Sequence, residues 1–176
     1  MKDKILDGKK LLIAPYSRML LNGAKNPKNF PHWEEYVRLV KDAGAVVTQI
    51  GMSGEPTIGA DFVLLDRPPA ELKTLLDLCD VWLTVDTFFQ HFAWHHGKPG
   101  IVVFSQSDPL IFGHKENLNI LKSEKYLRNN QFNSWTEAIY DPESFVSADE
   151  VFRSTVEFVL QPGTSGIVYS EHKSLS

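Results

Sequence analysis

The sequence predicts a Rossmann-like α/β fold, a three-layer sandwich in which helices cover both faces of a mostly parallel sheet. Short apolar runs alternate with helical patterns of about ten residues, an order typical of right-handed β-α-β units. Two of the runs, 81–85 (VWLTV) and 100–104 (GIVVF), lack polar/apolar alternation, as expected for strands covered on both faces. The 176 residues suffice to bury a core without disulfides.

Six strands are expected, each a short apolar run bounded by turn-forming residues. The last of them is expected at the edge of the sheet. Their ranges are 11–14, 45–50, 62–65, 81–85, 100–104 and 118–121.

Four helices are expected between and after these strands, over 31–41, 69–78, 87–96 and 148–160. In the first, apolar residues recur at i, i+3, i+4 and i+7 and so line one face. These residues are Trp33, Tyr36, Val37 and Val40. We expect one domain over 1–160. The remainder, 161–176, lacks periodicity and is expected to form a flexible tail.

Composition excludes several classes of protein. The formal net charge of −4 argues against a broad nucleic-acid footprint, although a local basic patch is compatible with it. No apolar run approaches the roughly 18 residues that a membrane span needs, and residues 1–10 do not resemble a signal peptide. With a single cysteine, Cys79, a reducing cytoplasmic setting is expected.

The loop after the first strand is basic, with Arg18, Lys25 and Lys28. Ligands of parallel α/β sheets bind beyond the carboxyl ends of the strands, where this loop lies. Its cations are suited to a phosphate or diphosphate. The alternative is an ordinary solvated loop.

Two further strand ends carry polar residues. Asp86 and Thr87 begin a helix, where free backbone amides attract anions, and His91 follows one turn later. The alternative here is a capping aspartate and a packed histidine. Glu55 closes the turn after the second strand and is suited to accept hydrogen bonds from a ribose, unless this is a plain exposed turn. We expect no metal site, because the adjacent His95 and His96 face different sides of a helix.

Three motifs, in order over about residues 10–110, resemble the family 9 glycosyltransferases, the ADP-heptose:lipopolysaccharide heptosyltransferases of GT-B fold. KNFP at 28–31, before a helix and a strand ending QIG, is similar to the family pattern K-x-W-P. DTFFQHFA at 86–93, followed by GKP and VVF, resembles D-[ST]-G-x-x-H-L-A, G-x-P and V-x-L-F-G. The segment from 69 to 80 resembles the family's short helix ending in Asp. The resemblance covers the C-terminal, donor-binding half of those enzymes.

This resemblance implies a metal-independent, cofactor-free site for a nucleotide-diphosphate sugar such as ADP-heptose. Its donor-binding residues are Ser17, Arg18, Lys28, Glu55, Asp86, Thr87 and His91. By analogy, Lys28 contacts the diphosphate or sugar, Glu55 the ribose, and Asp86 the sugar hydroxyls. Thr87 and nearby amides take the phosphates, as do Ser17 and Arg18, and His91 buttresses the helix start.

Two departures from the family pattern affect the expected function. Phe88 stands where the family has glycine, so bulky Phe88 and Phe89 begin the helix. The family's other half, which holds the acceptor and the catalytic base in heptosyltransferases, has no counterpart in this chain. A homodimer or a separate acceptor-binding chain would supply it. Local candidates for the base are Asp108 and Glu116.

Three functions therefore remain open from the sequence. The first is glycosyl transfer to an unknown acceptor. The second is a nucleotide or nucleotide-sugar binding module without turnover. The third is a glycosyltransferase that modifies DNA bases, which the basic loop at 18–28 permits and the net charge does not support.

Overall fold

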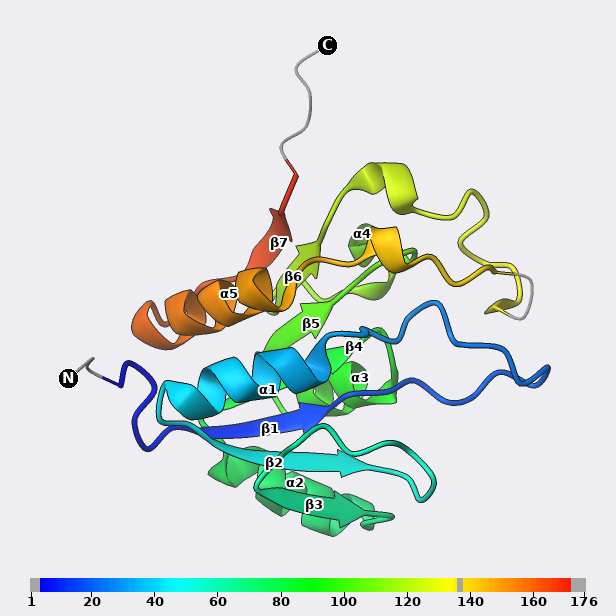
Figure 1. Ribbon diagram of the computed structural model, residues 1–176. Coiled ribbons are helices and arrows are strands. Elements are labelled where there is room, and N and C mark those ends of the chain that lie inside the picture. The colour runs from blue at the N-terminus through cyan, green and yellow to red at the C-terminus, as the bar shows by residue number, and fades with distance from the viewer. Residues whose placement is uncertain (1–3, 136–137, 172–176) are drawn as a thin grey trace.

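The computed structural model describes residues 4–135 and 138–171, and its centre is one parallel sheet of seven strands (Figure 1). The strand order is β3-β2-β1-β4-β5-β6-β7, and every neighbouring pair is parallel. The strands are β1 (Lys10–Ala14), β2 (Val46–Gly51), β3 (Phe62–Leu65), β4 (Val81–Val85), β5 (Ile101–Val103), β6 (Leu118–Leu121) and β7 (Gly166–Tyr169). The predicted fold class is confirmed.

Helices cover both faces of this sheet. In Figure 1, α1 (Trp33–Asp42) and α5 (Ala148–Leu160) lie in front of it, and α2 (Pro69–Leu78) and α3 (Phe88–His95) lie behind it. Shorter elements are α4 (Pro109–Phe112), η1 (Glu124–Tyr126) and η3 (Pro142–Ser144). The four predicted helices are confirmed with ends that differ by two residues at most. No helix of the described ranges is long and apolar enough to cross a membrane.

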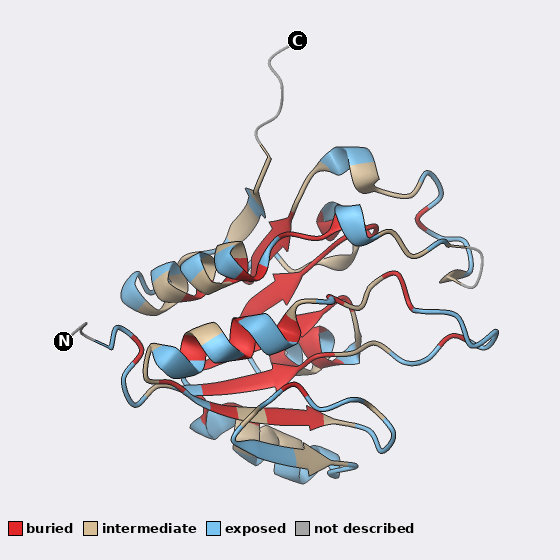
Figure 2. Ribbon diagram, viewed as in Figure 1, coloured by how far each residue is buried: buried red, intermediate tan, exposed pale blue. Residues whose placement is uncertain are grey.

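The core divides at the sheet into two layers because side chains of a strand alternate between its faces. Leu11 and Ile13 of β1 pack in the layer of α1 and α5, whereas Leu12 packs in the layer of α2 and α3. All five residues of β4 are buried (Figure 2). The first layer is joined by a 2.7 Å hydrogen bond between the Tyr36 and Thr155 hydroxyls of α1 and α5, and complete burial raises the pKa of Tyr36.

The sequence prediction was wrong at the end of the chain. Residues 161–176 were expected to form a tail, but Gly166–Tyr169 is strand β7 and pairs in parallel with β6. As a result β6, predicted as an edge strand, is an interior strand whose four residues are all buried. Four residues are too few to show a period, and the partner strand lies far away in sequence. The rest of the predicted tail, 172–176, lies outside the described residues.

Helix α5 has a complete sequence-encoded start. The Ser147 hydroxyl accepts from the Glu150 amide, and the Glu150 carboxylate accepts from the Ser147 amide, both at 3.1 Å. This capping box satisfies two of the amides that a helix start leaves without partners. Neither Ser147 nor Glu150 lines the cleft described next.

Candidate functional site: a cleft at the carboxyl edge of the sheet

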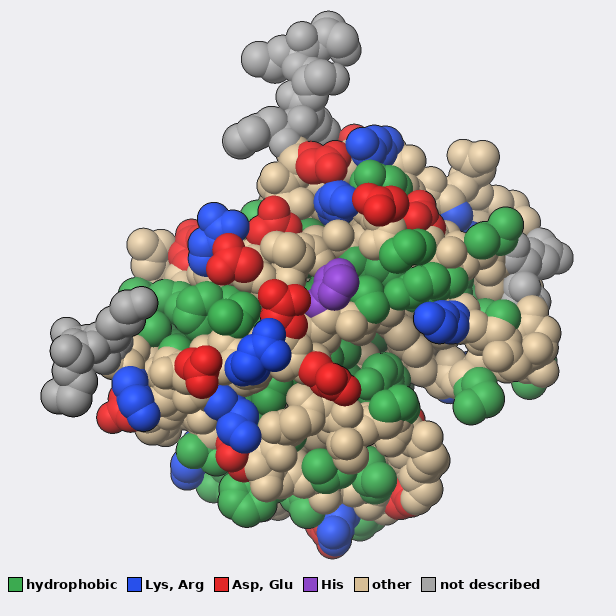
Figure 3. Space-filling model, in the orientation of Figure 1, with side chains coloured by type: hydrophobic (Ala, Val, Ile, Leu, Met, Phe, Trp, Pro, Cys, Tyr) green, Lys and Arg blue, Asp and Glu red, His purple; other side chains and the backbone are tan. Residues whose placement is uncertain are grey.

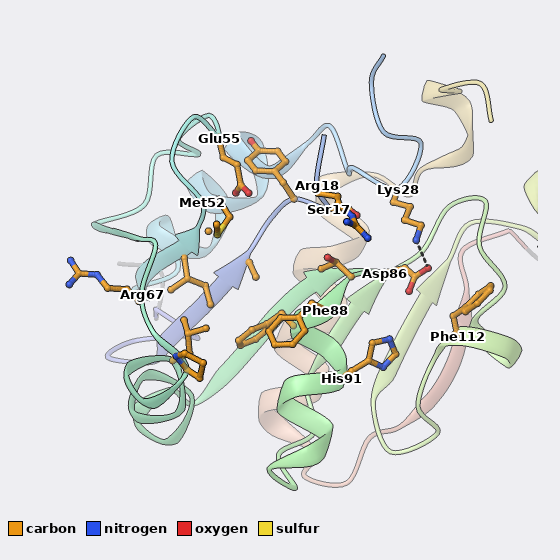
Figure 4. A pocket seen from close by; sticks show the side chains of 18 residues that line it. Ser17, Arg18, Lys28, Met52, Glu55, Arg67, Asp86, Phe88, His91 and Phe112 are labelled. Atoms are coloured by element: carbon orange, nitrogen blue, oxygen red, sulfur yellow. Dashed lines mark ion pairs between the residues drawn. The ribbon is translucent and has the colours of Figure 1, made fainter. Parts of the chain in front are cut away.

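A cleft of about 680 Å³ opens at the carboxyl ends of the strands, where the chain order reverses between β1 and β4 (Figure 4). This is the topological switch point at which open α/β sheets bind ligands. The structure brings together all seven residues that the resemblance implied for a donor site. They are Ser17, Arg18, Lys28, Glu55, Asp86, Thr87 and His91.

The long β1–α1 loop is folded by asparagines, which the sequence analysis did not single out. The Ser17 amide donates to Asn29 Oδ1 at 2.7 Å, and Asn26 Nδ2 donates to the Arg18 carbonyl at 2.9 Å. Asn26 Oδ1 also accepts from the Lys28 amide at 2.9 Å. These bonds hold the two arms of the loop side by side. They place Ser17 and Arg18 next to Lys28 at one wall of the cleft.

Lys28 and Asp86 form an ion pair across the cleft, with Nζ and Oδ2 3.3 Å apart. Both side chains are well shielded, at 18% and 7% exposed. The other Asp86 oxygen accepts from Gln90 Nε2 at 2.7 Å, and Lys28 Nζ lies 4.7 Å from the centre of the Trp135 ring. Lys28 is therefore a positioned cation, and the Asp86 carboxylate is already engaged on both oxygens.

The start of α3 faces the same cleft. Thr87 is the N-cap residue with extended backbone, but its side chain makes no capping hydrogen bond. The prediction of a helix start at this position is therefore confirmed, whereas side-chain capping by Thr87 is not seen. Uncapped first-turn amides are available to an anion.

Phe88, which stands where the family has glycine, and the following Phe89 have different environments. Phe89 is buried and meets the Trp82 ring edge-to-face at 5.6 Å, so it fixes α3 on the sheet. Phe88 is 65% exposed and lines the cleft. Phe89 thus has a packing role, and Phe88 offers an aromatic surface to a ligand.

Glu55 lies at the other end of the cleft, after β2. Its Oε2 is buried and has no hydrogen-bond partner in the structure. Burial raises the pKa of Glu55, the Met52 backbone opposes this shift, and Asp66 adds to it. A Cβ at Gly51 would lie 2.3 Å from Oε2, so only glycine at this position leaves room for the carboxylate. An unpartnered acceptor held in this way is suited to ligand hydroxyls.

Replacing Glu55 by glutamine should stabilise the protein at pH 7 and weaken its binding of a nucleoside. Burial raises the folded-state pKa above the unfolded one. The favourable contribution of Glu55 is therefore complete below its ordinary value of 4.5 and is lost as the pH rises through the folded pKa. Urea unfolding of wild type and Glu55→Gln should show a variant that is more stable at pH 7, with the gap closing below pH 4.5. If the variant and wild type differ in unfolding free energy by the same amount at pH 7 and below pH 4.5, this prediction is wrong.

The candidates for a local base are not in the cleft. Asp108 caps α4 by accepting from the Leu110 amide at 2.9 Å. Glu116 does not line the cleft either. Among the residues that the structure describes, no group of three or more His, Cys, Asp or Glu side chains could hold a metal ion.

Two further residues line the cleft that were not among the predicted donor-binding residues. Tyr16 begins the segment after β1 where a ligand was expected, and burial raises its pKa, with added effects of Glu34 and Glu55. Arg67 follows β3, beyond Asp66 with its positive φ of 55°. Both could have been found by the rule that ligands lie beyond strand ends, because each comes within two residues of one.

The fold and the cleft together define a Rossmann-type α/β protein with a candidate ligand site at its switch point. No protein-family model matches the chain, and a search of curated proteins finds no relative. Solved structures do match. E. coli ADP-heptose LPS heptosyltransferase II has a TM-score of 0.64 at 15% identity, covering 86% of this chain. E. coli heptosyltransferase WaaC with ADP has a TM-score of 0.58 at 19% identity, covering 85% of this chain.

The chain spans about half of these two enzymes, 46% and 44% of their lengths. At such identities the likeness shows a shared fold. The resemblance that the sequence motifs indicated is therefore confirmed for the fold of half a heptosyltransferase.

Proposed function

We propose that the cleft binds a nucleotide-diphosphate sugar and that the protein takes part in metal-independent glycosyl transfer. One observation carries this proposal. A single cleft holds cations and a helix start at one end and Glu55, whose Oε2 has no hydrogen-bond partner, at the other. That distribution complements a molecule with an anionic centre and a hydroxyl-bearing end.

The arrangement supports a division of roles. Glu55 accepts hydrogen bonds from the ribose, while Lys28, Arg18 and the first-turn amides of α3 face the diphosphate. Charge builds on a nucleoside diphosphate as it leaves the sugar, and preorganised cations and helix amides stabilise that charge. When Lys28 turns to the phosphates, Asp86 is released to accept from sugar hydroxyls.

Thermal denaturation with ADP, UDP, GDP and AMP, each in the presence of EDTA, tests this proposal. One diphosphate should raise the melting temperature by about 5–10 °C at 100 times its Kd, and AMP should raise it less. Release of nucleoside diphosphate from ADP-, UDP- and GDP-sugars then tests turnover. If no nucleotide stabilises the protein, the proposal fails.

A binding module without turnover is the second candidate. It is supported by the state of the carboxylates in the cleft, since Asp86 is engaged by Lys28 and Gln90. Stabilisation by a diphosphate, with no release of diphosphate from any of the three sugars, would favour this candidate.

Glycosyl transfer also needs a surface that binds the acceptor, and we propose that a second polypeptide supplies this surface. Apolar side chains stand exposed on segments that follow the strand ends, including Met19, Leu21, Leu110 and Phe132 at 78%, 99%, 74% and 79%. Large apolar side chains that stand exposed together are typical of a docking surface. Light scattering of the purified chain distinguishes a homodimer from a monomer that needs another chain.

DNA as the acceptor receives less support. On the face formed by α1 and α5, acidic and basic side chains are interspersed (Figure 3). This face therefore offers no continuous basic surface to a phosphate backbone.

A further inference from the structure

Two histidines make direct contact at the edge of the cleft. Nδ1 of His91, in the first half of α3, lies 2.8 Å from Nε2 of His114, which follows α4. The two rings meet edge-to-face, with centroids 5.0 Å apart. Trp94, one turn further along α3, stacks on His114 at 4.5 Å with planes 8° apart. His114 is thus held in place and in turn holds His91.

A hydrogen bond between two imidazoles couples the protonation states of the two rings. One proton lies between the two nitrogens, so both rings cannot be protonated while the bond is kept. Burial, and then His91, lower the pKa of His114, while Glu116 opposes the shift. With His91 Nδ1 donating to His114, Nε2 of His91 carries a lone pair. This is the logic by which an orienting partner sets the tautomer of a catalytic histidine.

Among the described residues that line the cleft, no other base is well placed at this end. Asp86 accepts from Gln90 and, in the proposed function, from the sugar hydroxyls of the donor, and Glu55 follows β2, which is separated from β4 by β1. Two strand spacings amount to about 10 Å, so Glu55 and the start of α3 are at opposite ends of a ligand. His91 is one turn into α3, next to the amides that face the diphosphate. In Figure 4 its ring lies between α3 and Phe112.

We propose that His91 is the general base of the transfer and that His114 is the residue that positions it. This rests on the proposed function. Nε2 of His91 takes the proton of the acceptor hydroxyl as its oxygen bonds to the anomeric carbon. The bond from that carbon to the diphosphate oxygen breaks, and its electron pair leaves with the nucleoside diphosphate. The catalytic base is then part of this chain, and the partner supplies only the acceptor surface.

The charged groups around the pair are Glu116 beside His114 and, along the cleft, Arg18 and the Lys28–Asp86 ion pair. The ion pair is neutral as a unit. Burial and the neighbouring His91 lower the pKa of His114, so replacing His114 should change the acid side of the pH–rate profile.

His91→Gln tests the base directly, with release of nucleoside diphosphate from ADP-glucose, UDP-glucose and GDP-mannose to water as the readout. The kcat should fall by about 100-fold or more, the contribution of a general base, while ADP affinity changes less than about threefold. His95→Gln is the matched control, because His95 is on the same helix and does not line the cleft. Its kcat should stay within about twofold of wild type.

His114 is tested by two replacements. His114→Gln keeps an amide where Nε2 lies and should retain most of the kcat, whereas His114→Ala should lose most of it. Long-range ¹⁵N–¹H spectra of the imidazoles should show the Nδ1–H tautomer of His91 in wild type and its loss in His114→Ala. A merely structural role would change neither the tautomer nor the pH profile.

The outcomes separate the two proposals. Turnover that His91→Gln leaves within twofold overturns the base assignment and leaves the proposed function standing. ADP binding without turnover in wild type overturns both the transfer and the base. Equal loss in His114→Gln and His114→Ala, with an unchanged tautomer, overturns the positioning role.

Discussion

Replacing Lys28 by alanine should weaken the binding of ADP by about 10- to 100-fold. A hydrogen bond to a charged group contributes about 1.5–3 kcal/mol, and Lys28 is a well-shielded cation that the loop asparagines and Trp135 hold in place. Less entropy is then lost when it meets a phosphate. Isothermal titration of ADP and AMP measures the effect. The loss should be larger for ADP, because the second phosphate adds charge at this wall.

Lys25→Ala is the matched control for this experiment. Lys25 is on the same loop, but its Nζ lies over the Tyr140 ring at 5.1 Å and it does not line the cleft. Its removal should leave ADP affinity within about twofold. Lys28→Ala also takes the cation away from the 7%-exposed Asp86, which keeps its hydrogen bond from Gln90, so urea unfolding must accompany the titration. Equal ADP affinity in both variants would remove Lys28 from the site.

Much of this site could be predicted because it depends on local order along the chain. Apart from Lys28 and His91, each candidate donor-binding residue comes within four residues of the end of a strand, and parallel strands bring their carboxyl ends to one edge. For that reason Glu55 and Asp86, which are 31 positions apart in the sequence, meet in one cleft. The helix start at Asp86-Thr87 could also be predicted from the sequence, because an N-cap residue follows a buried strand there.

Other features depend on contacts between distant segments, which no local pattern encodes. The His91–His114 bond joins residues 23 apart, and the packing of Trp135 on Lys28 comes from the segment between β6 and α5. The pairing of β7 with β6 was missed for the same reason. The different environments of Phe88 and Phe89 were also not predictable, because both are apolar and the helix phase at its first turn decides which of them is buried.

Gly100→Ala should give the largest loss of stability of any change considered for this protein, about 1–3 kcal/mol. A Cβ at Gly100 would lie 2.1 Å from Cε2 of Trp82, a ring that is fully buried. The ring cannot simply move aside, because its Nε1 donates to the Lys98 carbonyl at 2.9 Å. Urea unfolding measures the change. A loss below about 0.5 kcal/mol would show that the ring relaxes.

Gly97→Asn is the matched glycine replacement. Gly97 ends α3 with a φ of +74° and has open space around it, and asparagine tolerates this conformation. It should cost less than Gly100→Ala. Together the two variants explain why a GKPG segment follows α3. One glycine ends the helix, and the other makes room for Trp82.

Gly100→Ala should also change the geometry of the cleft. Trp82 meets Phe89, and Phe89 fixes the start of α3, so a displaced indole shifts the amides that face the diphosphate. Gly100→Ala should therefore lower ADP affinity even in conditions where the variant is fully folded. Ser147→Ala separates the two effects. It removes a capping box whose residues do not line the cleft, costs about 1 kcal/mol, and should leave ADP affinity unchanged. If Gly100→Ala binds ADP as wild type does, Trp82 supports the core alone and the start of α3 is held by other contacts.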